Sequence, residues 1–255
     1  MELSRRGGLS GFALKVLAVA FMLCDHVGYF IFRRGLFAPW TSPAGFLSFS
    51  DAPAYVQTAN QVYRVLDVLG HAAFPLFCFL LAEGVAHTRS RKRYLLTLLA
   101  FALVTEPIYD WTHYGVLWSW QLQNVLFTLT VCCAELCALD WVRERFSAET
   151  RKRRWLLALT VIFAGALAFL VRGEYVFLGT TAAALFHLLR EKGTWRLAGL
   201  LALLPASPWA LLAAPLLLLY NGRRGKRGWK YAFYVFYPAH FPVLMWIGTL
   251  CAKKF

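Results

Sequence analysis

Apolar runs separated by short polar segments recur along the whole chain. Most of these runs have close to the twenty residues with which a helix crosses about 30 Å of hydrocarbon, which predicts an all-α polytopic transmembrane bundle of about eight to nine membrane segments. One integral membrane domain over residues 1–255 is expected, and its first run, which lacks a small-residue cleavage site, is expected to stay in the mature protein. The predicted segments are residues 13–32, 65–86, 94–109, 121–141, 155–171, 175–189, 197–220 and 231–251.

Lys and Arg concentrate in the short segments between these runs. Because cytoplasmic loops of membrane proteins are enriched in both residues, the pattern predicts a cytoplasmic N-terminus. Arg33, Arg34 and Arg172 then fall on the outer side as exceptions. The same distribution accounts for the formal net charge of +14, so no nucleic acid partner is expected. The basic segments are residues 5–6, 89–93, 143–154, 190–196 and 223–230.

Residues 197–220 conflict with a simple alternation of crossings. One crossing would carry the basic residues 223–230 to the outer side, and two crossings do not fit, because each half beside Pro205 and Pro208 has about ten residues and spans only ~15 Å. A re-entrant helical hairpin that opens to the cytoplasm resolves the conflict, since neighbouring helices can satisfy its broken backbone. A single kinked span is the alternative.

Composition adds little beyond the membrane prediction, since 59% of the residues are hydrophobic and 16% are charged. The six cysteines all lie in apolar runs without paired C-x-x-C spacing, so neither a disulfide framework nor a metal site is expected. They are interpreted as small packing residues. The cysteines are Cys24, Cys78, Cys132, Cys133, Cys137 and Cys251.

Several polar and ionisable side chains fall within or beside the predicted hydrocarbon layer. An ionisable group costs a few kcal/mol there, so a set of them indicates a functional site. With a cytoplasmic N-terminus they converge on the middle and outer half of the bilayer and predict a polar chamber. An interhelical hydrogen bond is the alternative for any one of them. The set is Asp25, His26, His71, Glu106, Asp110, Gln123, Asn124, Glu174 and His240.

His26 and His240 are the candidates for acid–base chemistry, because imidazole titrates near neutral pH. Asp25 is not expected to orient His26, because adjacent helical residues point about 100° apart. Lys15 precedes His26 by eleven positions, close to three helical turns, so the two share a helix face about 16 Å apart. That spacing suits a ligand with an anionic head and a reactive tail, and snorkelling of Lys15 at the helix end is the alternative.

Short motifs combine these polar residues with Gly, Pro and aromatic residues. In chain order they are Leu14-Lys15 with Asp25-His26-Val27-Gly28, Ala73-Phe74-Pro75-Leu76-Phe77, Glu83-Gly84, Glu106-Pro107 with Asp110, Gln123-Asn124-Val125, Gly173-Glu174-Tyr175, Tyr220-Asn221-Gly222, and Tyr237-Pro238 with His240. Together they resemble the TraX family, whose named member acetylates the F-type pilin subunit at its N-terminus in conjugation. The chain differs at Gly70-His71, where the family is expected to have Gly-Arg.

The Lys15 and His26 spacing is also similar to a basic-x10-His pattern in a broader group of membrane acyltransferases. The resemblance implies a bacterial inner-membrane enzyme that moves an acetyl group from cytosolic acetyl-CoA to an acceptor amine or hydroxyl. Its expected partners are membrane lipid, acyl-CoA and an acceptor protein or envelope glycan. Which acceptor is used stays open.

The resemblance also implies roles for individual residues. His26 is expected to be the general base, with Asn124 or Gln123 donating to the developing oxyanion. Cytoplasmic cations are expected to hold the CoA phosphates. The catalytic group is His26, His240, Asp25, Glu106 and Asn124; the donor-binding group is Lys15, Arg223, Arg224 and Lys226; the acceptor-binding group is His71, Asp110, Gln123, Glu174 and Tyr175.

Two other classes of protein remain open at this point. A transporter or permease also places ionisable groups at the midplane and uses broken helices, although no inverted repeat is evident in this chain. In a structural assembly factor, the polar groups would only fix helix packing.

Overall fold

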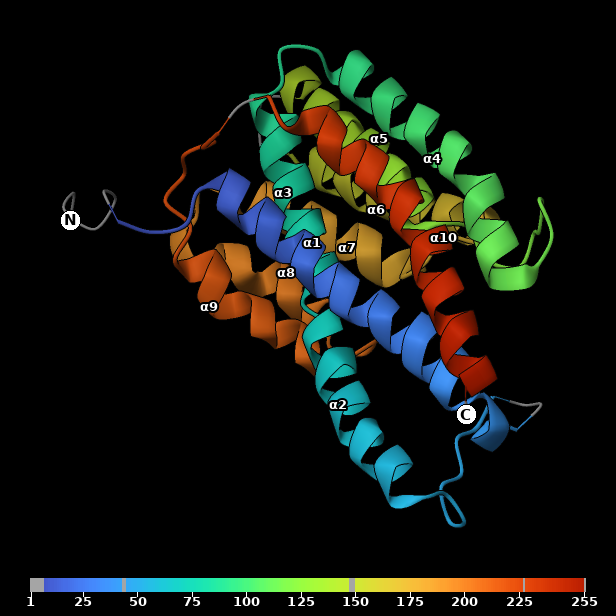
Figure 1. The fold of residues 1–255 in the computed structure, drawn as a ribbon. Coiled ribbons are helices and arrows are strands. Elements are labelled where there is room, and N and C mark those ends of the chain that lie inside the picture. The colour runs from blue at the N-terminus through green and yellow to red at the C-terminus, as the bar shows by residue number, and fades with distance from the viewer. Residues whose placement is uncertain (1–6, 43–44, 147–149, 227, 255) are drawn as a thin grey trace.

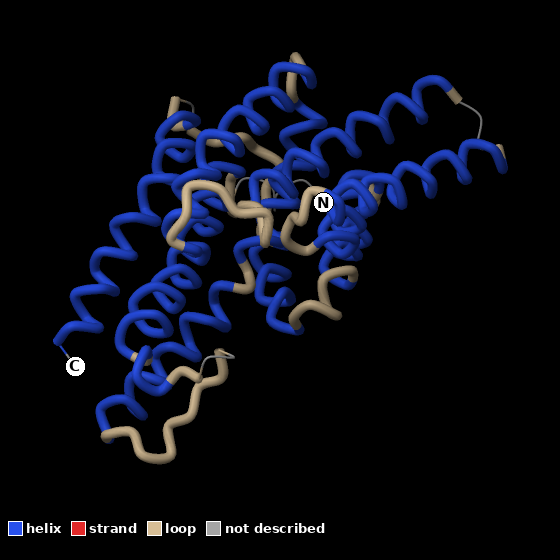
Figure 2. The backbone as a smooth tube through the Cα atoms, turned by 90° about the vertical axis from the view of Figure 1, so that its right-hand side faces the viewer, coloured by secondary structure: helices blue, strands red, loops and turns tan. Residues whose placement is uncertain are grey.

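The computed structural model describes residues 7–42, 45–146, 150–226 and 228–254, and helices dominate all four ranges (Figures 1 and 2). Within them there is no strand beyond two isolated β-bridges, so the all-α prediction is confirmed. Four short stretches are 3₁₀- or π-helical: η2 (Gly28–Leu36), η3 (Ala38–Trp40), η4 (Gly193–Leu197) and η5 (Pro208–Leu212). The α-helices are α1 (Gly11–Val27), α2 (Ala54–Gly70), α3 (Ala73–His87), α4 (Arg91–Tyr114), α5 (Val125–Arg145), α6 (Arg151–Leu170), α7 (Val176–Leu188), α8 (Ala198–Leu201), α9 (Ala213–Leu218) and α10 (Lys230–Lys254).

In the part of the chain that the structure describes, five helical stretches are long and apolar enough to cross a membrane by length and composition. Helix α4 has spanning length but carries Glu106 and Asp110 in its second half and is not among the five. Two further apolar helices, Val176–Leu188 and Pro208–Leu218, are shorter. The predicted count of eight to nine membrane segments therefore stays a prediction. The five stretches are Gly11–Leu36, Ala54–His87, Val125–Arg145, Arg151–Leu170 and Tyr231–Lys253.

Large apolar side chains cover much of the outside of the bundle. Phe163 and Phe169 on α6 and Trp246 on α10 are all more than half exposed. Such a surface is unfavourable in water over so large an area and favourable against lipid chains. The exposed apolar faces therefore agree with the membrane environment indicated by the five long helices.

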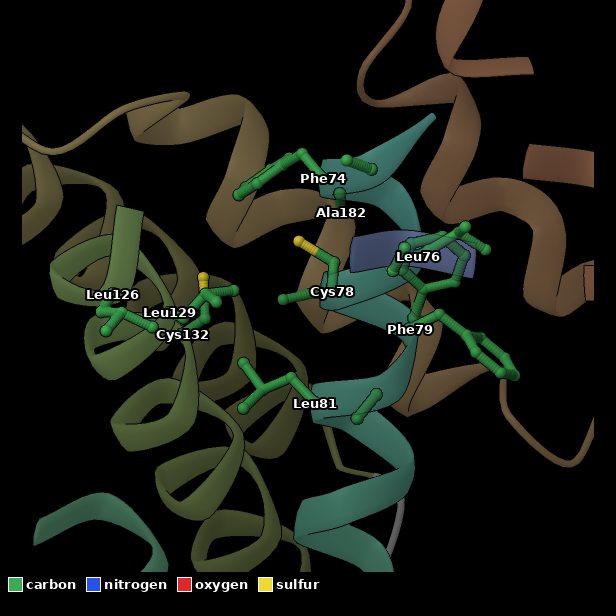
Figure 3. Packing of buried hydrophobic residues seen from close by; sticks show 14 of the residues in the cluster. Phe74, Leu76, Cys78, Phe79, Leu81, Leu126, Leu129, Cys132 and Ala182 are labelled. Atoms are coloured by element: carbon green, nitrogen blue, oxygen red, sulfur yellow. The ribbon is translucent and has the colours of Figure 1, made fainter. Parts of the chain in front are cut away.

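The centre of the bundle is α3, which packs against α1, α5 and α7. Figure 3 shows its buried side chains, among them Phe74 and Leu81, facing α5 and α7. Cys78 on α3 and Cys132 on α5 are fully buried in this apolar cluster. All six cysteines are free thiols, and these two act as the small packing residues that the sequence predicts.

Residues 193–220 double back on themselves. A straight helix over residues 197–220 would separate its ends by about 36 Å at a rise of about 1.5 Å per residue. Instead, Nη2 of Arg196 donates to the carbonyl of Leu217 over 3.0 Å, so the start and the end of this stretch meet. The geometry is that of a hairpin with a Pro-containing turn. Whether the hairpin enters a bilayer stays a prediction.

The hairpin returns the chain to the end of the bundle where α1 starts. Leu9 donates its backbone N–H to Leu219 over 2.8 Å, and Gly11 donates to Arg223 over 2.8 Å. The exposed side chains of Arg223, Arg224 and Lys226 therefore lie beside the first turn of α1. We call this end of the bundle, with residues 89–93, 190–196 and 223–226, the basic end.

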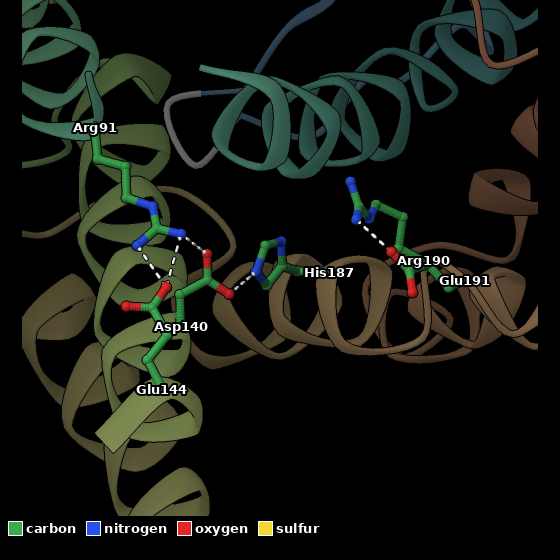
Figure 4. A network of polar contacts seen from close by, with 6 residues as sticks. All are labelled: Arg91, Asp140, Glu144, His187, Arg190 and Glu191. Atoms are coloured by element: carbon green, nitrogen blue, oxygen red, sulfur yellow. Dashed lines mark hydrogen bonds and ion pairs between the residues drawn. The ribbon is translucent and has the colours of Figure 1, made fainter. Parts of the chain in front are cut away.

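An ion network that is buried at His187 and exposed at Glu144 ties the same end together across three helices (Figure 4). Asp140 on α5 accepts from Arg91 on α4 over 2.8 Å and lies 2.7 Å from Nε2 of His187 on α7. Arg91 also reaches Glu144 over 3.2 Å. The His187 side chain is only 4% exposed, so this network fixes the relative height of α4, α5 and α7 inside the bundle.

Helix α10 packs very closely on the π-helical stretch η2 through two glycines. A Cβ on Gly35 would lie 2.7 Å from the carbonyl oxygen of Gly248, and a Cβ on Gly248 would collide with the carbonyl oxygen of Phe30. π-Helical turns are rare and are often found at functional sites. Through this contact α10 packs directly on η2, which follows His26 in the chain. His240 on α10 therefore lies within reach of His26.

We expect Gly248→Val to destabilise the fold, because the added side chain has no room beside Phe30. Overpacking of a filled interior typically costs about 1–3 kcal/mol. The measurement is thermal unfolding in detergent, followed by labelling of the buried cysteines. Ala252→Val is the matched control, since Ala252 is exposed on the same helix. Equal stability of the two variants would contradict the close packing.

Candidate active site

Two histidines from opposite ends of the chain meet inside the bundle. Nδ1 of His26 on α1 lies 2.6 Å from Nε2 of His240 on α10, and the two rings stack with centroids 4.8 Å apart. His240 is 5% exposed, and the His26 side chain is 17% exposed. The two residues that the sequence marks for acid–base chemistry are therefore in direct contact, although 214 positions separate them.

The contacts of the pair assign its tautomers. Nδ1 of His240 lies 3.2 Å from the carbonyl oxygen of Phe236, which only accepts hydrogen bonds, so this nitrogen carries the proton. In the neutral ring Nε2 of His240 is then an acceptor, and Nδ1 of His26 donates to it. The two rings together then have one nitrogen that neither carries a proton nor accepts a hydrogen bond, and this is Nε2 of His26. That nitrogen is the base.

Asp25 lies close to this basic nitrogen. Its Oδ2 atom is 3.9 Å from Nε2 of His26, which is too long for a hydrogen bond but close enough to stabilise a positive charge on the ring. The prediction from helix geometry that Asp25 does not orient its neighbour through a hydrogen bond agrees with this distance. Asp25 therefore acts on the charge of His26 rather than on its orientation.

The junction between α2 and α3 closes the other side of Asp25. A Cβ on Gly70 would lie 2.6 Å from the Cβ of Asp25, so only glycine permits this approach. His71, the next residue, donates from Nδ1 to the carbonyl of Asp67 over 2.7 Å. Its Nε2 atom is then the unprotonated nitrogen, so His71 offers an acceptor at the position where the family is expected to have an arginine.

Glu106 and Asn124 form a second polar pair, between α4 and the start of α5. Oε2 of Glu106 accepts from both the backbone N–H and the side-chain amide of Asn124. The amide of Asn124 also donates to Ala102 over 3.0 Å, and its oxygen caps α5 by accepting from Leu126 over 3.1 Å. Both amide hydrogens are engaged, so a contact with a developing oxyanion would require this pairing to open.

The other predicted acceptor-binding residues lie at the end of the bundle that is opposite to the basic end. We call this opposite end the far end and define it by Arg34, Thr112, Ser119 and Arg172. Asp110 accepts from the backbone of Ser119 over 2.6 Å, and the side chain of Gln123 donates to the carbonyl of Ser119 over 3.0 Å. The backbone of Gln123 donates to Arg172 over 3.0 Å. These contacts tie the loop after α4 to the turn after α6.

Glu174 and Tyr175 lie in the turn between α6 and α7. Thr128 donates to the carbonyl of Glu174 over 2.9 Å, and the Tyr175 ring stacks on Phe74 with centroids 3.8 Å apart. Burial raises the pKa of the Glu174 carboxyl to about 7, and the nearby negative charges of Asp25 and Glu106 act in the same direction. A substantial fraction of Glu174 is therefore protonated near neutral pH, and the three carboxyl groups share one region.

An interior cavity of about 120 Å³ lies between α1, α3, α4, α5 and α10. Lys15 lines it, with Nζ 5.5 Å from the centroid of the Phe233 ring. Tyr237, which also lines it, contacts the His240 ring with centroids 5.8 Å apart. The cavity therefore runs from the cation near the start of α1 toward the histidine pair, and most of its remaining lining is apolar.

Sequence reasoning missed several polar residues of the site region. His113 stacks on Tyr109 with centroids 4.0 Å apart and contacts Phe241 at 5.5 Å. Arg34 donates to the backbone of Thr112 and His113. The predicted segment stops at residue 109, whereas α4 continues to Tyr114. The spacing of three between Asp110 and His113, typical of one helix face, was the available signal.

Two buried groups elsewhere were also missed. His187 with Asp140 forms the core of the network at the basic end. Glu135 on α5 is 3% exposed, and neither of its carboxylate oxygens has a hydrogen-bond partner among the described residues. Within the same residues, no group of three or more His, Cys, Asp or Glu side chains is arranged to hold a metal ion.

Comparison with known proteins gives two matches. The model of the family described as "TraX protein" matches residues 10–248. A probable fimbrial assembly protein of Dichelobacter nodosus, FimC of serogroup H1, is 29% identical over 280 residues, which cover 99% of this chain and 98% of that protein. No solved structure matches the chain.

We expect Asn124→Ala to destabilise the protein through two losses. Removal of a helix N-cap costs about 1 kcal/mol, and a buried carboxyl left without donors costs about 1–3 kcal/mol more. Thermal unfolding in detergent measures the sum, with Gln121→Ala in the same loop as the exposed control.

The double change Asn124→Ala with Glu106→Met separates the two losses. It removes the unpaired carboxyl and is expected to recover part of the stability. If the double variant is no more stable than Asn124→Ala, the Glu106 carboxyl does not need the hydrogen bonds of Asn124 to be tolerated in the interior.

Proposed function

This chain belongs to the TraX family, and on that premise we propose that it is a membrane-embedded acetyltransferase, which moves an acetyl group from acetyl-CoA to an acceptor amine or hydroxyl. The observation that carries the proposal is the contact between His26 and His240, whose tautomers leave one basic nitrogen next to Asp25. A pair of this kind suits proton removal from a nucleophile, which is the demanding step of acetyl transfer near neutral pH.

The donor is placed at the basic end. Arg223, Arg224 and Lys226 bind the CoA phosphates there, because exposed cations beside the first turn of α1 form charge-assisted hydrogen bonds with phosphate oxygens. Lys15 stands at the cavity that leads inward from that end. The thioester arm enters this cavity and presents the acetyl group toward His240 and His26.

His26 is the general base. Its Nε2 atom takes the proton of the acceptor amine or hydroxyl as that group attacks the thioester carbonyl. The new bond joins the acceptor nitrogen or oxygen to the acetyl carbon, the carbon–sulfur bond breaks, and the CoA thiolate receives the proton from His26. His240 accepts the hydrogen bond from Nδ1 of His26 throughout, and Asp25 stabilises the transient positive charge.

The acceptor is placed at the far end. Glu106, Asp110 and Glu174 are carboxyl groups in this part of the bundle, and such groups hold an ammonium or a hydroxyl by hydrogen bonds. The relative from Dichelobacter nodosus carries the name of a probable fimbrial assembly protein, which supports a pilin subunit as acceptor. An envelope glycan is the second acceptor class.

The membrane orientation completes the proposal. The N-terminus and the basic end face the cytoplasm of a bacterial inner membrane, where acetyl-CoA is made. Residues 193–220 re-enter the membrane as a hairpin that opens to the same side. Support comes from the basic segments 89–93, 190–196 and 223–226, which gather at one end because this stretch doubles back.

We expect His26→Ala to lower the rate of acetyl transfer by about 10² to 10⁴, the usual contribution of a general base, while acetyl-CoA still binds. The rate is measured as chromatographic release of CoA from acetyl-CoA by the protein in nanodiscs, with ethanolamine as acceptor. His87→Ala is the control, because the His87 side chain is 67% exposed and remote from the pair. An unchanged rate in the His26 variant would refute the assignment.

We expect the double change Lys15→Ala, Arg224→Ala to weaken acetyl-CoA binding by at least about tenfold, because charge-assisted hydrogen bonds are worth about 1.5–3 kcal/mol each. Isothermal titration calorimetry measures the affinity. Arg151→Ala, Arg154→Ala removes two exposed cations from α6 and is the matched control. If folded wild-type protein binds no acetyl-CoA at all, the transporter becomes the better reading.

A further inference from the structure

A wide polar groove opens at the far end of the bundle, outside the residues assigned above. Its volume is about 570 Å³. The π-helical stretch η2, the turn after it and the end of α4 form its wall. The lining residues are Tyr29, Arg33, Arg34, Ala38, Thr41 and His113.

Two arginines in this groove have no acidic partner. Among the described residues, no carboxylate lies within ion-pair distance of Arg33 or Arg34. Nη2 of Arg33 donates to the carbonyl of Gly45 over 2.9 Å, and its guanidinium also lies beside the Tyr63 hydroxyl. Two arginines that line one groove and whose charge is not neutralised attract an anion.

Arg34 is held in place by backbone carbonyls and by the Tyr29 ring, whose centroid lies 5.9 Å from its Cζ atom. Its Nη1 atom donates to Thr112 over 2.7 Å and to His113 over 3.1 Å. A guanidinium carries five N–H donors, so Nη2 and Nε of Arg34 remain without a protein acceptor among the described residues. Those donors form the planar fork that pairs with both oxygens of a phosphate or carboxylate.

Membrane topology does not account for these two cations. Most clusters of Lys and Arg gather at the basic end, as the positive-inside rule requires, whereas Arg33 and Arg34 lie at the opposite end, where Arg172 and Lys253 also lie. Because that rule disfavours cations at this end, we expect Arg33 and Arg34 to have a local function.

Two packed rings, His113 on the groove wall and the fully buried Phe241 behind it, separate the groove from the histidine pair. His113 in the groove contacts Phe241 with centroids 5.5 Å apart, and Phe241 contacts His26 at 5.0 Å and His240 at 4.1 Å. A molecule anchored at Arg33 and Arg34 is therefore close to the proposed base, with Phe241 between them.

We infer that this groove binds a phosphate or carboxylate carried by the acceptor molecule near its nucleophilic amine or hydroxyl. The statement that the bound molecule is the acetyl acceptor rests on the proposed function, whereas the existence of the anion site does not. Arg33 and Arg34 hold the oxyanion, and the nucleophile extends past Phe241 toward His26.

The anion site is tested first by binding alone. Inorganic pyrophosphate is titrated by calorimetry into the protein in phosphatidylcholine nanodiscs. The background is Lys15→Ala, Arg223→Ala, Arg224→Ala, Lys226→Ala, which removes the cations assigned to the donor phosphates. Adding Arg33→Gln, Arg34→Gln is expected to weaken binding at least about tenfold. Unchanged affinity would overturn the site, whatever the outcome for acetyl-CoA.

Two further variants keep this result interpretable. Arg33→Gln alone leaves the contacts of Arg34 with α4 intact, so it serves if the double change unfolds the protein. Arg33→Lys, Arg34→Lys retains the charge but loses the fork, and is expected to restore binding only in part. Full restoration by lysine would show a diffuse charge effect in place of a built site.

The acceptor assignment is tested with two amines that differ in one group. Phosphoethanolamine carries a phosphate two carbons from its amine, and ethanolamine lacks it. We expect kcat/KM for CoA release to be at least about tenfold higher for phosphoethanolamine, and Arg33→Gln, Arg34→Gln to remove that preference through KM with kcat retained. No preference in an active enzyme would overturn the acceptor role.

A membrane lipid is the other source of a phosphate at this position. Nanodiscs with phosphatidylglycerol in place of part of the phosphatidylcholine separate the two sources. If the anionic lipid abolishes pyrophosphate binding and the phosphoethanolamine preference, the groove holds a headgroup and the acceptor assignment fails. If pyrophosphate binding and the phosphoethanolamine preference are both retained in the anionic membrane, the acceptor assignment is supported.

Discussion

The constraint on which this structure depends is the absence of hydrogen-bond partners in hydrocarbon. A polar group inside the bundle must find its partner within the protein, because a lone one costs several kcal/mol. Most polar groups of the interior are accordingly joined in pairs or networks: His26 with His240, Glu106 with Asn124, and Asp140 with Arg91 and His187. Each joins different helices, so the same contacts that satisfy the polar groups also set the relative positions of the helices.

Close backbone approach makes the central pair possible. An imidazole contact of 2.6 Å between α1 and α10 requires the two helices to touch, and they touch where Gly35 meets Gly248 and where Gly248 meets the backbone of Phe30. Small residues serve this purpose in membrane bundles, where packing replaces the hydrophobic effect as the driving force between helices. On the other side of α1, Gly70 likewise permits a close approach of the backbone, here to Asp25.

The two ends of the bundle differ in chemistry. The basic end carries clustered cations and the entrance side of the cavity at Lys15, whereas the far end carries the carboxyl groups and the groove of Arg33 and Arg34. The histidine pair lies between them. The doubling back of residues 193–220 is what returns the cations of residues 223–226 to the basic end.

The sequence by itself determined the all-α class, the membrane environment, the gathering of basic residues between segments and the choice of His26 and His240 as candidates, because all of these follow from local periodicity and residue chemistry. The predicted helix bounds were wrong in places: residues 65–86 were expected as one segment, whereas α2 ends at Gly70 and α3 begins at Ala73. Only the tertiary structure decided that the two histidines touch, that both amide hydrogens of Asn124 are engaged, and that Arg34 and His113 share a groove. Such contacts depend on how helices remote in sequence approach one another, and that approach is set by packing at a few glycines, which periodicity does not reveal.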